Sequence, residues 1–215
     1  MDVYLLPGLG ADHRLFGRLE LPGHTLHYLD RPEVPVGSTM ADIARLLASR
    51  VNAQVRHALV GVSMGGMEAQ ELAALTHPRK VVLISSWKGP QEMPAHLKLL
   101  RGTHPERLLS KIFMQGSLPV IRWQMGVEEP DEVQLLDSFL QMTNLEQLRI
   151  QISACLNWEG PAQPVPGLVR LHGDRDRLMP ISNIQGTQVV KGGGHFMVFS
   201  HGAEVSALVA KALEE

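Results

Sequence analysis

Cysteine is almost absent from this 215-residue sequence, which contains only Cys155. One cysteine cannot form an internal disulfide, so the fold needs no oxidising compartment, and it excludes a zinc site built from several thiolates. Aromatic residues make up 5% of the chain, which leaves little material for stacking nucleic-acid bases. Neither sign of charge dominates, because 20 Lys and Arg face 22 Asp and Glu. This balance argues against broad electrostatic binding to nucleic acid or acidic membranes.

Long hydrophobic runs are also missing, and none approaches the roughly 20 residues that a membrane-spanning helix needs. The first residues carry no basic leader and are interrupted by Pro7, unlike a secretory signal. We therefore expect a soluble, cytoplasmic protein without membrane insertion. Hydrophobic residues make up 44% and charged residues 20%, enough to bury a sizeable core. The length fits one domain, or a compact domain with an insertion.

Short apolar runs alternate with helical patterns at both ends of the chain. The runs that we interpret as strands are 3–6, 25–29, 57–62, 80–85, 168–172 and 188–190, and the helical patterns cover 39–51, 63–76 and 203–213. The run 80–85 is continuously apolar, as expected when helices cover both faces of a sheet. The pattern predicts an α/β fold with a mostly parallel sheet of about six strands, flanked by helices.

The middle of the chain lacks a convincing strand. It offers only helical candidates, near 93–101, 105–115, 117–125, 131–143 and 145–158, followed by a proline-rich joint. We therefore expect an α/β core formed by 1–86 and 161–215. We expect residues 87–160 to form an inserted, all-helical cap or lid over one end of the sheet.

The strongest motif lies between a predicted buried strand and a predicted helix, and reads Gly61-Val62-Ser63-Met64-Gly65-Gly66. A Gly-x-Ser-x-Gly sequence at a sharp strand-to-helix turn exposes the serine hydroxyl at the carboxyl edge of the sheet. The N–H of Met64, at the start of the helix, can face a developing oxyanion. The alternative is an ordinary serine that caps the helix.

A serine nucleophile needs a base, and the base needs an orienting acid. His195 follows three glycines after a late strand, and Asp174 and Asp176 both follow the strand before it. A loop histidine without a function and a solvated charge cluster are the alternatives. Ser, Asp and His nevertheless each follow a separate predicted strand, at the edge where open α/β sheets bind ligands.

In these motifs the chain resembles the α/β-hydrolase fold superfamily over nearly its whole length. The family's nucleophile elbow corresponds to Ser63, and its Gly-His-Phe segment corresponds to residues 194–196. Its Gly-x-x-Asp-x-x-x-Pro acid loop matches Gly173, Asp176 and Pro180, which favours Asp176 over Asp174 as the acid.

The family's early turn corresponds to Pro7-Gly8-Leu9-Gly10. The resemblance implies that the Leu9 N–H is the second oxyanion donor, beside the N–H of Met64. Pro7 stands where the family usually has histidine, which departs from typical esterases but leaves the backbone donor available. The antiparallel strands that usually precede this turn are missing, so the chain resembles a small, trimmed member of the superfamily.

The same turn also imitates a dinucleotide-binding fingerprint. Gly8 and Gly10 follow the first strand, and Asp30 lies about twenty residues further on. The third glycine of that fingerprint is replaced by His13, where close packing needs a small residue. We therefore favour the oxyanion turn.

Together these features predict a serine hydrolase, carboxylesterase-like, that cleaves a small apolar ester or related acyl substrate through Ser63, His195 and Asp176. Ten methionines, several of them beside the motifs, suggest a flexible apolar pocket, although they also serve as core filling. Alternatives on the same fold are carbon–carbon bond hydrolysis, a lyase reaction, or a binding protein with weak turnover. We expect a small-molecule substrate, no cofactor, no metal and no nucleic acid; the sequence does not reveal the oligomeric state.

Overall fold

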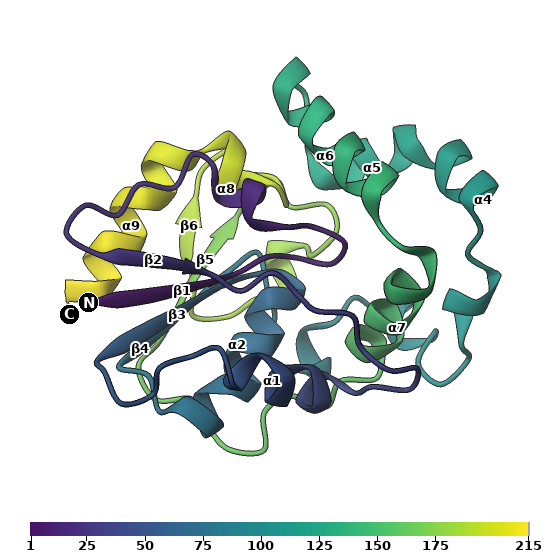
Figure 1. Ribbon diagram of the computed structural model, residues 1–215. Helices are drawn as coiled ribbons and strands as arrows, with labels where there is room; N and C mark the ends of the chain where they lie inside the picture. The colour runs from purple at the N-terminus through teal and green to yellow at the C-terminus, as the bar shows by residue number, and fades with distance from the viewer. Residues whose placement is uncertain (215) are drawn as a thin grey trace.

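The computed structural model describes residues 1–214 and contains a six-stranded sheet with helices on both faces (Figure 1). Every neighbouring pair of strands is parallel, and the strand order is β2-β1-β3-β4-β5-β6. The strands are β1 (Asp2–Leu6), β2 (Thr25–Tyr28), β3 (His57–Val62), β4 (Lys80–Ile84), β5 (Leu168–Gly173) and β6 (Gln188–Val190). The predicted α/β fold with about six strands is therefore confirmed.

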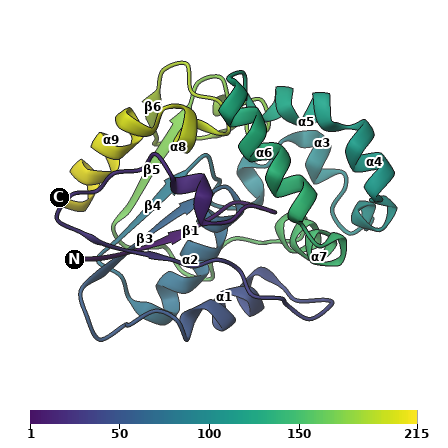
Figure 2. The ribbon, with the colours of Figure 1, turned by 45° about the horizontal axis from the view of Figure 1, so that its top comes forward.

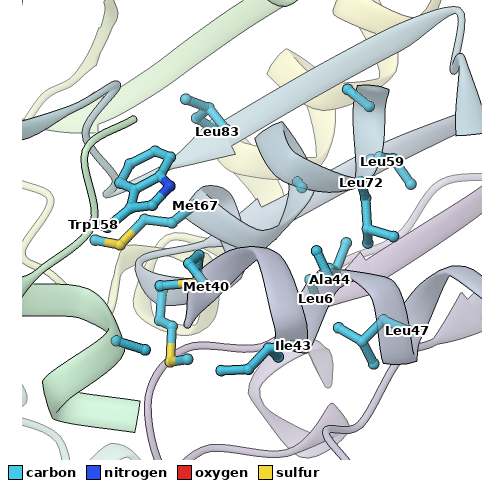
Figure 3. Packing of buried hydrophobic residues seen from close by; sticks show 14 of the residues in the cluster. Leu6, Met40, Ile43, Ala44, Leu47, Leu59, Met67, Leu72, Leu83 and Trp158 are labelled. Atoms are coloured by element: carbon cyan, nitrogen blue, oxygen red, sulfur yellow. The ribbon is translucent and has the colours of Figure 1, made fainter. Parts of the chain in front are cut away.

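The continuous apolar runs of the central strands reflect burial of both sheet faces. Successive side chains of a strand point to opposite faces, and in β1 Tyr4 and Leu6 pack in one core cluster whereas Val3 and Leu5 pack in the other. Figure 3 shows the first cluster, in which side chains of the sheet meet those of two helices. Because β1, β3 and β4 each contribute side chains to both clusters, an alternating polar pattern is not tolerated in them.

Helices α1 and α2 cover one face of the sheet, and α8 and α9 lie on the other (Figures 1 and 2). The bounds are α1 (Met40–Ala48), α2 (Met64–Thr76), α8 (Met197–Ser200) and α9 (Gly202–Glu214), with short 3-10 helices η1 (His13–Phe16) and η4 (Ile181–Asn183). In α1 the buried residues Met40, Ile43, Ala44 and Leu47 form one stripe, as its 3.6-residue period predicts. Helix α2 is buried around most of its surface.

The segment 87–160 joins β4 to β5 and contains only helices and loops. They are η2 (Pro90–Glu92), α3 (Ala95–Lys98), η3 (Pro105–Leu108), α4 (Lys111–Gly116), α5 (Leu118–Met125), α6 (Pro130–Met142) and α7 (Leu145–Leu156). The carboxyl ends of the strands point toward this segment, while both chain ends lie at the opposite side (Figures 1 and 2). We call it the helical insertion. Within residues 1–214, no helix combines the length and the hydropathy needed to cross a membrane.

The first two helical stretches of the insertion are shorter than the sequence predicts. The stretch predicted at 93–101 keeps one helical turn after Pro94, and the stretch at 105–115 is divided into η3 and α4. Ser110 is extended, with φ −136°, and its hydroxyl caps α4 by accepting from the Phe113 N–H. A residue that caps one helix cannot continue the helix before it, which explains the break.

The strand order reverses between β1 and β3. From β1 the chain first adds β2 on one side and then returns to place β3 on the other. At such a switch point, the loops that follow the two neighbouring strands separate and leave a crevice at the carboxyl edge of the sheet. The residues directly after β1 and β3, Pro7 and Ser63, are therefore brought to the same crevice.

Candidate active site

Ser63 occupies a strained turn between β3 and α2. Its backbone angles are φ 54° and ψ −120°, a region that side-chain-bearing residues rarely adopt. The turn is fixed by hydrogen bonds: the Ser63 N–H donates to the Ile84 carbonyl (2.9 Å), and its carbonyl accepts from the Ser86 hydroxyl (2.7 Å). The Ser63 side chain makes no capping hydrogen bond to α2. The helix-capping alternative therefore does not account for this serine.

The glycines of the motif permit a close approach of backbones. A Cβ atom on Gly61 would lie 2.2 Å from the Gly65 carbonyl oxygen, and one on Gly65 would lie 2.1 Å from the Leu6 carbonyl oxygen. Any side chain at either position would force α2 away from β1 and β3. The glycines thus allow the start of α2, with Ser63 just before it, to sit directly against the end of β1.

His195 and Asp176 are in direct contact. The His195 Nδ1 atom lies 2.8 Å from the Asp176 Oδ2 atom, and both side chains are buried. The other carboxylate oxygen of Asp176 accepts from the N–H groups of Leu178 (3.0 Å) and Met179 (2.8 Å). These bonds fix the carboxylate and leave the Nε2 atom of His195 available for another partner.

Asp174 points elsewhere. Its Oδ1 atom accepts from the Gly192 N–H (2.7 Å), so this side chain connects the loop after β5 to the glycine-rich loop after β6. Close backbone packing supports the same connection, because a Cβ on Gly173 would lie 2.1 Å from the Gly193 carbonyl oxygen. Of the two aspartates that the sequence left open, Asp176 is the one that meets His195.

A second histidine, His172, also contacts the acid. Its Nε2 atom lies 2.7 Å from the Met179 carbonyl oxygen and 3.4 Å from Asp176 Oδ2. Burial lowers the pKa of His172, although the Asp176 carboxylate and the Met179 carbonyl oppose this change. A neutral His172 with its proton on Nε2 donates to the Met179 carbonyl and leaves the carboxylate charge to His195.

Ser63 and His195 line one cavity of about 330 Å³ beneath the helical insertion. None of its lining residues, all of which belong to the described part of the chain, is Asp, Glu, Lys or Arg. About half of its wall comes from the insertion, and the lining residues are Gly8, Leu9, Gly10, Ala11, Leu15, Val62, Ser63, Met67, Trp87, Leu97, Leu109, Met114, Ile121, Met125, Leu136, Phe139, Leu140, Leu148, Ile152, Cys155, Leu156, Leu178, Met179, His195 and Phe196. Within residues 1–214 the Ser63 hydroxyl and the His195 ring share the cavity without a direct hydrogen bond.

Two backbone N–H groups near Ser63 have no partner among the described residues, those of Leu9 and Met64. Leu9 lines the cavity, and Met64 is the first residue of α2. Gly8 brings the turn close, because a Cβ on Gly8 would lie 3.5 Å from Ser63 Cβ. Free donors beside a serine hydroxyl fit the stabilisation of an oxyanion.

A model of the alpha/beta hydrolase family matches residues 3–208, which is nearly the whole chain. The chain belongs to the alpha/beta hydrolase family. Membership supports hydrolysis as the class of reaction. No curated protein matches the sequence.

Solved structures of other alpha/beta hydrolases are similar in fold. A thermophilic esterase from Thermogutta terrifontis has a TM-score of 0.75 at 18% identity, covering 100% of this chain and 89% of that chain. A hydrolase from Pseudomonas aeruginosa PA01 has a TM-score of 0.75 at 19% identity, covering 100% and 90%. YbtT, a type II thioesterase from the yersiniabactin pathway, has a TM-score of 0.67 at 16% identity, covering 98% and 92%. At these identities the likeness concerns the fold alone.

The dinucleotide-binding alternative does not fit this alpha/beta hydrolase. The turn after β1 leads into η1, a single 3-10 turn, rather than into a helix that could hold a pyrophosphate at its start. The carboxylate of Asp30 contacts the His13 ring, with Oδ2 2.6 Å from Nδ1.

A buried ion pair that the sequence does not predict lies beneath the turn. Two nitrogens of the Arg31 guanidinium donate to the two carboxylate oxygens of Glu68, and both side chains are almost fully buried. Burial lowers the pKa of Arg31, but the Glu68 carboxylate, with smaller contributions from Cys155 and Asp30, raises it overall; burial also raises the pKa of Glu68, which Arg31 opposes. The two-pronged contact is typical of a charged pair. The available signal in the sequence was Glu68 between the apolar residues Met67 and Ala69.

The cavity contains the chain's one thiol. Burial raises the pKa of Cys155 to about 12, and the nearby Glu68 carboxylate acts in the same direction while Arg31 opposes it. A thiol that stays protonated is a poor nucleophile. Among residues 1–214, no three His, Cys, Asp or Glu side chains are grouped so as to hold a metal ion.

Proposed function

We propose that this alpha/beta hydrolase is a serine hydrolase that cleaves esters, or related acyl compounds, with an apolar acyl group. The observation that carries the proposal is the convergence on one apolar cavity: Ser63 and His195 line it, and His195 contacts Asp176 at 2.8 Å. A serine and a histidine that share a cavity, with an aspartate bound to the histidine, form a catalytic triad that activates the serine hydroxyl for acyl transfer.

In the first half of the reaction, the Ser63 hydroxyl oxygen attacks the substrate carbonyl carbon, and its proton passes to His195 Nε2. Asp176 stabilises the imidazolium that forms. The carbonyl oxygen becomes an oxyanion that accepts from the Leu9 and Met64 N–H groups, each worth about 3–4 kcal/mol in comparable sites. The tetrahedral intermediate then collapses, and the alcohol leaves with the proton held by His195.

In the second half, water hydrolyses the acyl-enzyme. His195 takes a proton from the water as its oxygen attacks the acyl carbon, and then returns a proton to Ser63 as the carboxylic acid leaves. The same two N–H groups bind the second oxyanion. No further group is needed to balance the reaction.

The helical insertion, residues 87–160, serves in this proposal as a cap over a core formed by 1–86 and 161–215. Support comes from the cavity wall, about half of which belongs to the insertion. Because no Asp, Glu, Lys or Arg among residues 1–214 lines the cavity, an acyl group with a carboxylate or an ammonium would be desolvated there without an ion-pair partner from these residues. The substrate class that fits is therefore a neutral, apolar acyl group.

An active-site serine probe tests the nucleophile. We expect a fluorophosphonate to label the wild type and Ser138→Ala equally, because Ser138 lies on α6, where its hydroxyl donates to the Leu135 carbonyl of the same helix. Ser63→Ala should lose both labelling and hydrolysis of p-nitrophenyl esters. Undiminished labelling or hydrolysis by Ser63→Ala would disprove the proposal. Comparing p-nitrophenyl esters with acyl thioesters of equal chain length then decides which acyl compounds are preferred.

A further inference from the structure

The buried Arg31 side chain, which does not line the cavity, forms hydrogen bonds to the turn Pro7–Gly10. Arg31 Nη2 donates to the Pro7 carbonyl (2.7 Å), and Nη1 donates to the Gly8 carbonyl (3.3 Å). Nε and Nη2 of the same guanidinium bind the two oxygens of Glu68 on α2. One planar cation therefore connects the turn after β1 with the helix that follows Ser63.

The contact with Gly8 determines where the Leu9 N–H points. The Gly8 carbonyl and the Leu9 N–H belong to one peptide unit, and in a trans peptide these two groups point in opposite directions. The structure has no cis peptide bond within residues 1–214. The Gly8 oxygen accepts from Arg31 and from the Ala11 N–H (3.2 Å), so that side of the peptide is occupied. The Leu9 N–H is consequently turned away from Arg31, and Leu9 lines the cavity.

We propose that Arg31 is a positioning residue, which, anchored by Glu68, orients the Gly8–Leu9 peptide so that its N–H stabilises the oxyanion. The proposal rests on the proposed function, because it concerns an oxyanion formed at Ser63. A charge-assisted hydrogen bond to the Gly8 oxygen also polarises the peptide and strengthens its N–H as a donor. Arg31 contacts neither Ser63 nor the cavity and acts only through the turn.

The geometry requires arginine rather than a cation in general. The guanidinium uses Nε, Nη1 and Nη2 at once, on two carbonyl oxygens and a carboxylate. A lysine ammonium is a single point charge and cannot place donors in this fork. Arg31→Lys would keep a positive charge beside Glu68 but lose at least one of the hydrogen bonds to the turn.

The helical insertion reaches the same turn through two polar side chains. Gln151 Oε1 on α7 accepts from the Gly10 N–H (3.0 Å) and from Arg31 Nη1 (3.4 Å). The Thr143 hydroxyl oxygen lies 3.1 Å from the Gly10 carbonyl oxygen and 2.6 Å from the Phe139 carbonyl oxygen, between which its single proton is shared. The insertion therefore contributes to the orientation of the turn as well as to the cavity wall.

The test compares Arg31→Lys with Arg122→Lys. Arg122 is a matched control, because its Nε and Nη2 bind the two oxygens of Asp137 within the insertion, away from the turn. Three quantities are measured: kcat and KM for a p-nitrophenyl ester, the affinity for a trifluoromethyl ketone, and the affinity for the matching methyl ketone. The first ketone adds to Ser63 and forms an oxyanion, whereas the second reports filling of the cavity.

For Arg31→Lys we expect kcat to fall about 10- to 100-fold, less than the 10²–10³ for loss of an entire donor, with KM within about threefold. The affinity for the trifluoromethyl ketone should fall in parallel, and the affinity for the methyl ketone should stay unchanged. Arg122→Lys should resemble the wild type. An unchanged kcat in folded Arg31→Lys, or an equal loss of affinity for both ketones, would overturn the proposal.

Gln151→Leu provides the second variant in case Arg31→Lys does not fold. It removes an acceptor from the Gly10 N–H and leaves the Arg31–Glu68 pair in place. We expect a fall in kcat of about 3- to 10-fold with the same difference between the two ketones. A wild-type kcat in folded Gln151→Leu, when Arg31→Lys does not fold, counts against the proposal.

Failure of this inference can be told apart from failure of the proposed function. If Ser63→Ala stays active, the proposed function itself fails. If Ser63 is required but the Arg31 and Gln151 variants are unaffected, only this inference is refuted.

Discussion

The acid loop after β5 contains two aspartates with different structural tasks. Asp176 accepts from two backbone N–H groups and from the His195 ring, which fixes its carboxylate on three sides. Asp174 accepts from the Gly192 N–H and so ties two loops together. Only the first arrangement can stabilise a positive charge on the histidine during proton transfer. An amide would serve equally well in the second, because a neutral oxygen still accepts from an N–H.

The two aspartates should therefore respond differently to removal of the charge. We expect Asp176→Asn to lower kcat by about 10³–10⁴-fold, because an amide cannot stabilise the imidazolium and can favour the wrong ring tautomer. Asp174→Asn should keep kcat within about threefold, since its oxygen still accepts from Gly192. Steady-state hydrolysis of a p-nitrophenyl ester by both variants measures the difference. A larger loss in Asp174→Asn would show that the acid is wrongly assigned.

At the scale of one element, helix α1 begins with a reciprocal pair of hydrogen bonds. The Asp42 N–H donates to the Thr39 hydroxyl oxygen (3.2 Å), and the Thr39 N–H donates to the Asp42 carboxylate (2.9 Å). Both donors would otherwise lack partners at the helix start. The helix buries its apolar stripe against the sheet and α2, so the position of its first turn affects the core on that face (Figure 3).

Thr39→Ala should lower the free energy of unfolding by about 1 kcal/mol, because it removes one of the two capping bonds. Thr103→Ala is the control: this exposed threonine donates to the Leu100 carbonyl and caps no helix, so its loss should cost less. Urea denaturation of both variants measures the two changes. Equal losses would mean that the capping pair contributes nothing specific to α1.

The capping pair also predicts a dependence on pH. The Thr39 hydroxyl and N–H, and then Arg45, lower the pKa of Asp42 from 3.8 to about 2. A carboxyl whose pKa is lower in the folded state stabilises the fold above its unfolded value, and this contribution is lost as the pH falls from 3.8 toward 2. The advantage of the wild type over Asp42→Asn in urea denaturation should therefore be smaller at about pH 3 than at about pH 6, and modest throughout because the side chain is exposed.

At the scale of the whole molecule, the sequence predicts the features that depend on local patterns, namely the strands and the motifs that follow them. The central strands β1, β3 and β4 were recognisable because a strand that is buried on both faces is apolar along most of its length. The order Ser63, Asp176, His195 predicted one site because parallel strands bring their carboxyl ends to one edge. The Arg31–Glu68–Gln151 cluster was not predictable, because its members lie 37 to 120 residues apart in the sequence and meet only in the folded chain. The first helices of the insertion are also shorter than the sequence predicts, because hydrophobic periodicity does not reveal where a serine starts a new helix.

The division of the cavity wall between core and insertion leads to a prediction about the choice of substrate. Ile152 on α7 and Leu140 on α6 line the cavity from the insertion, whereas Ile112 on α4 is 84% exposed. Replacing Ile152 or Leu140 by Trp adds bulk inside the space that we assign to the acyl chain. Each methylene excluded from apolar surroundings costs about 0.8 kcal/mol, so an ester that loses several should react far more slowly.

We therefore expect Ile152→Trp and Leu140→Trp to lower kcat/KM for long-chain p-nitrophenyl esters by about tenfold or more, while the acetate ester reacts at close to the wild-type rate. The preferred chain length should shift to shorter esters, since the reacting groups are unchanged and only the space for the chain is reduced. Ile112→Trp, which adds the same bulk on the solvent side of the insertion, should keep the wild-type profile. If all three variants keep that profile, the acyl chain does not occupy this cavity and the insertion has no part in selecting it.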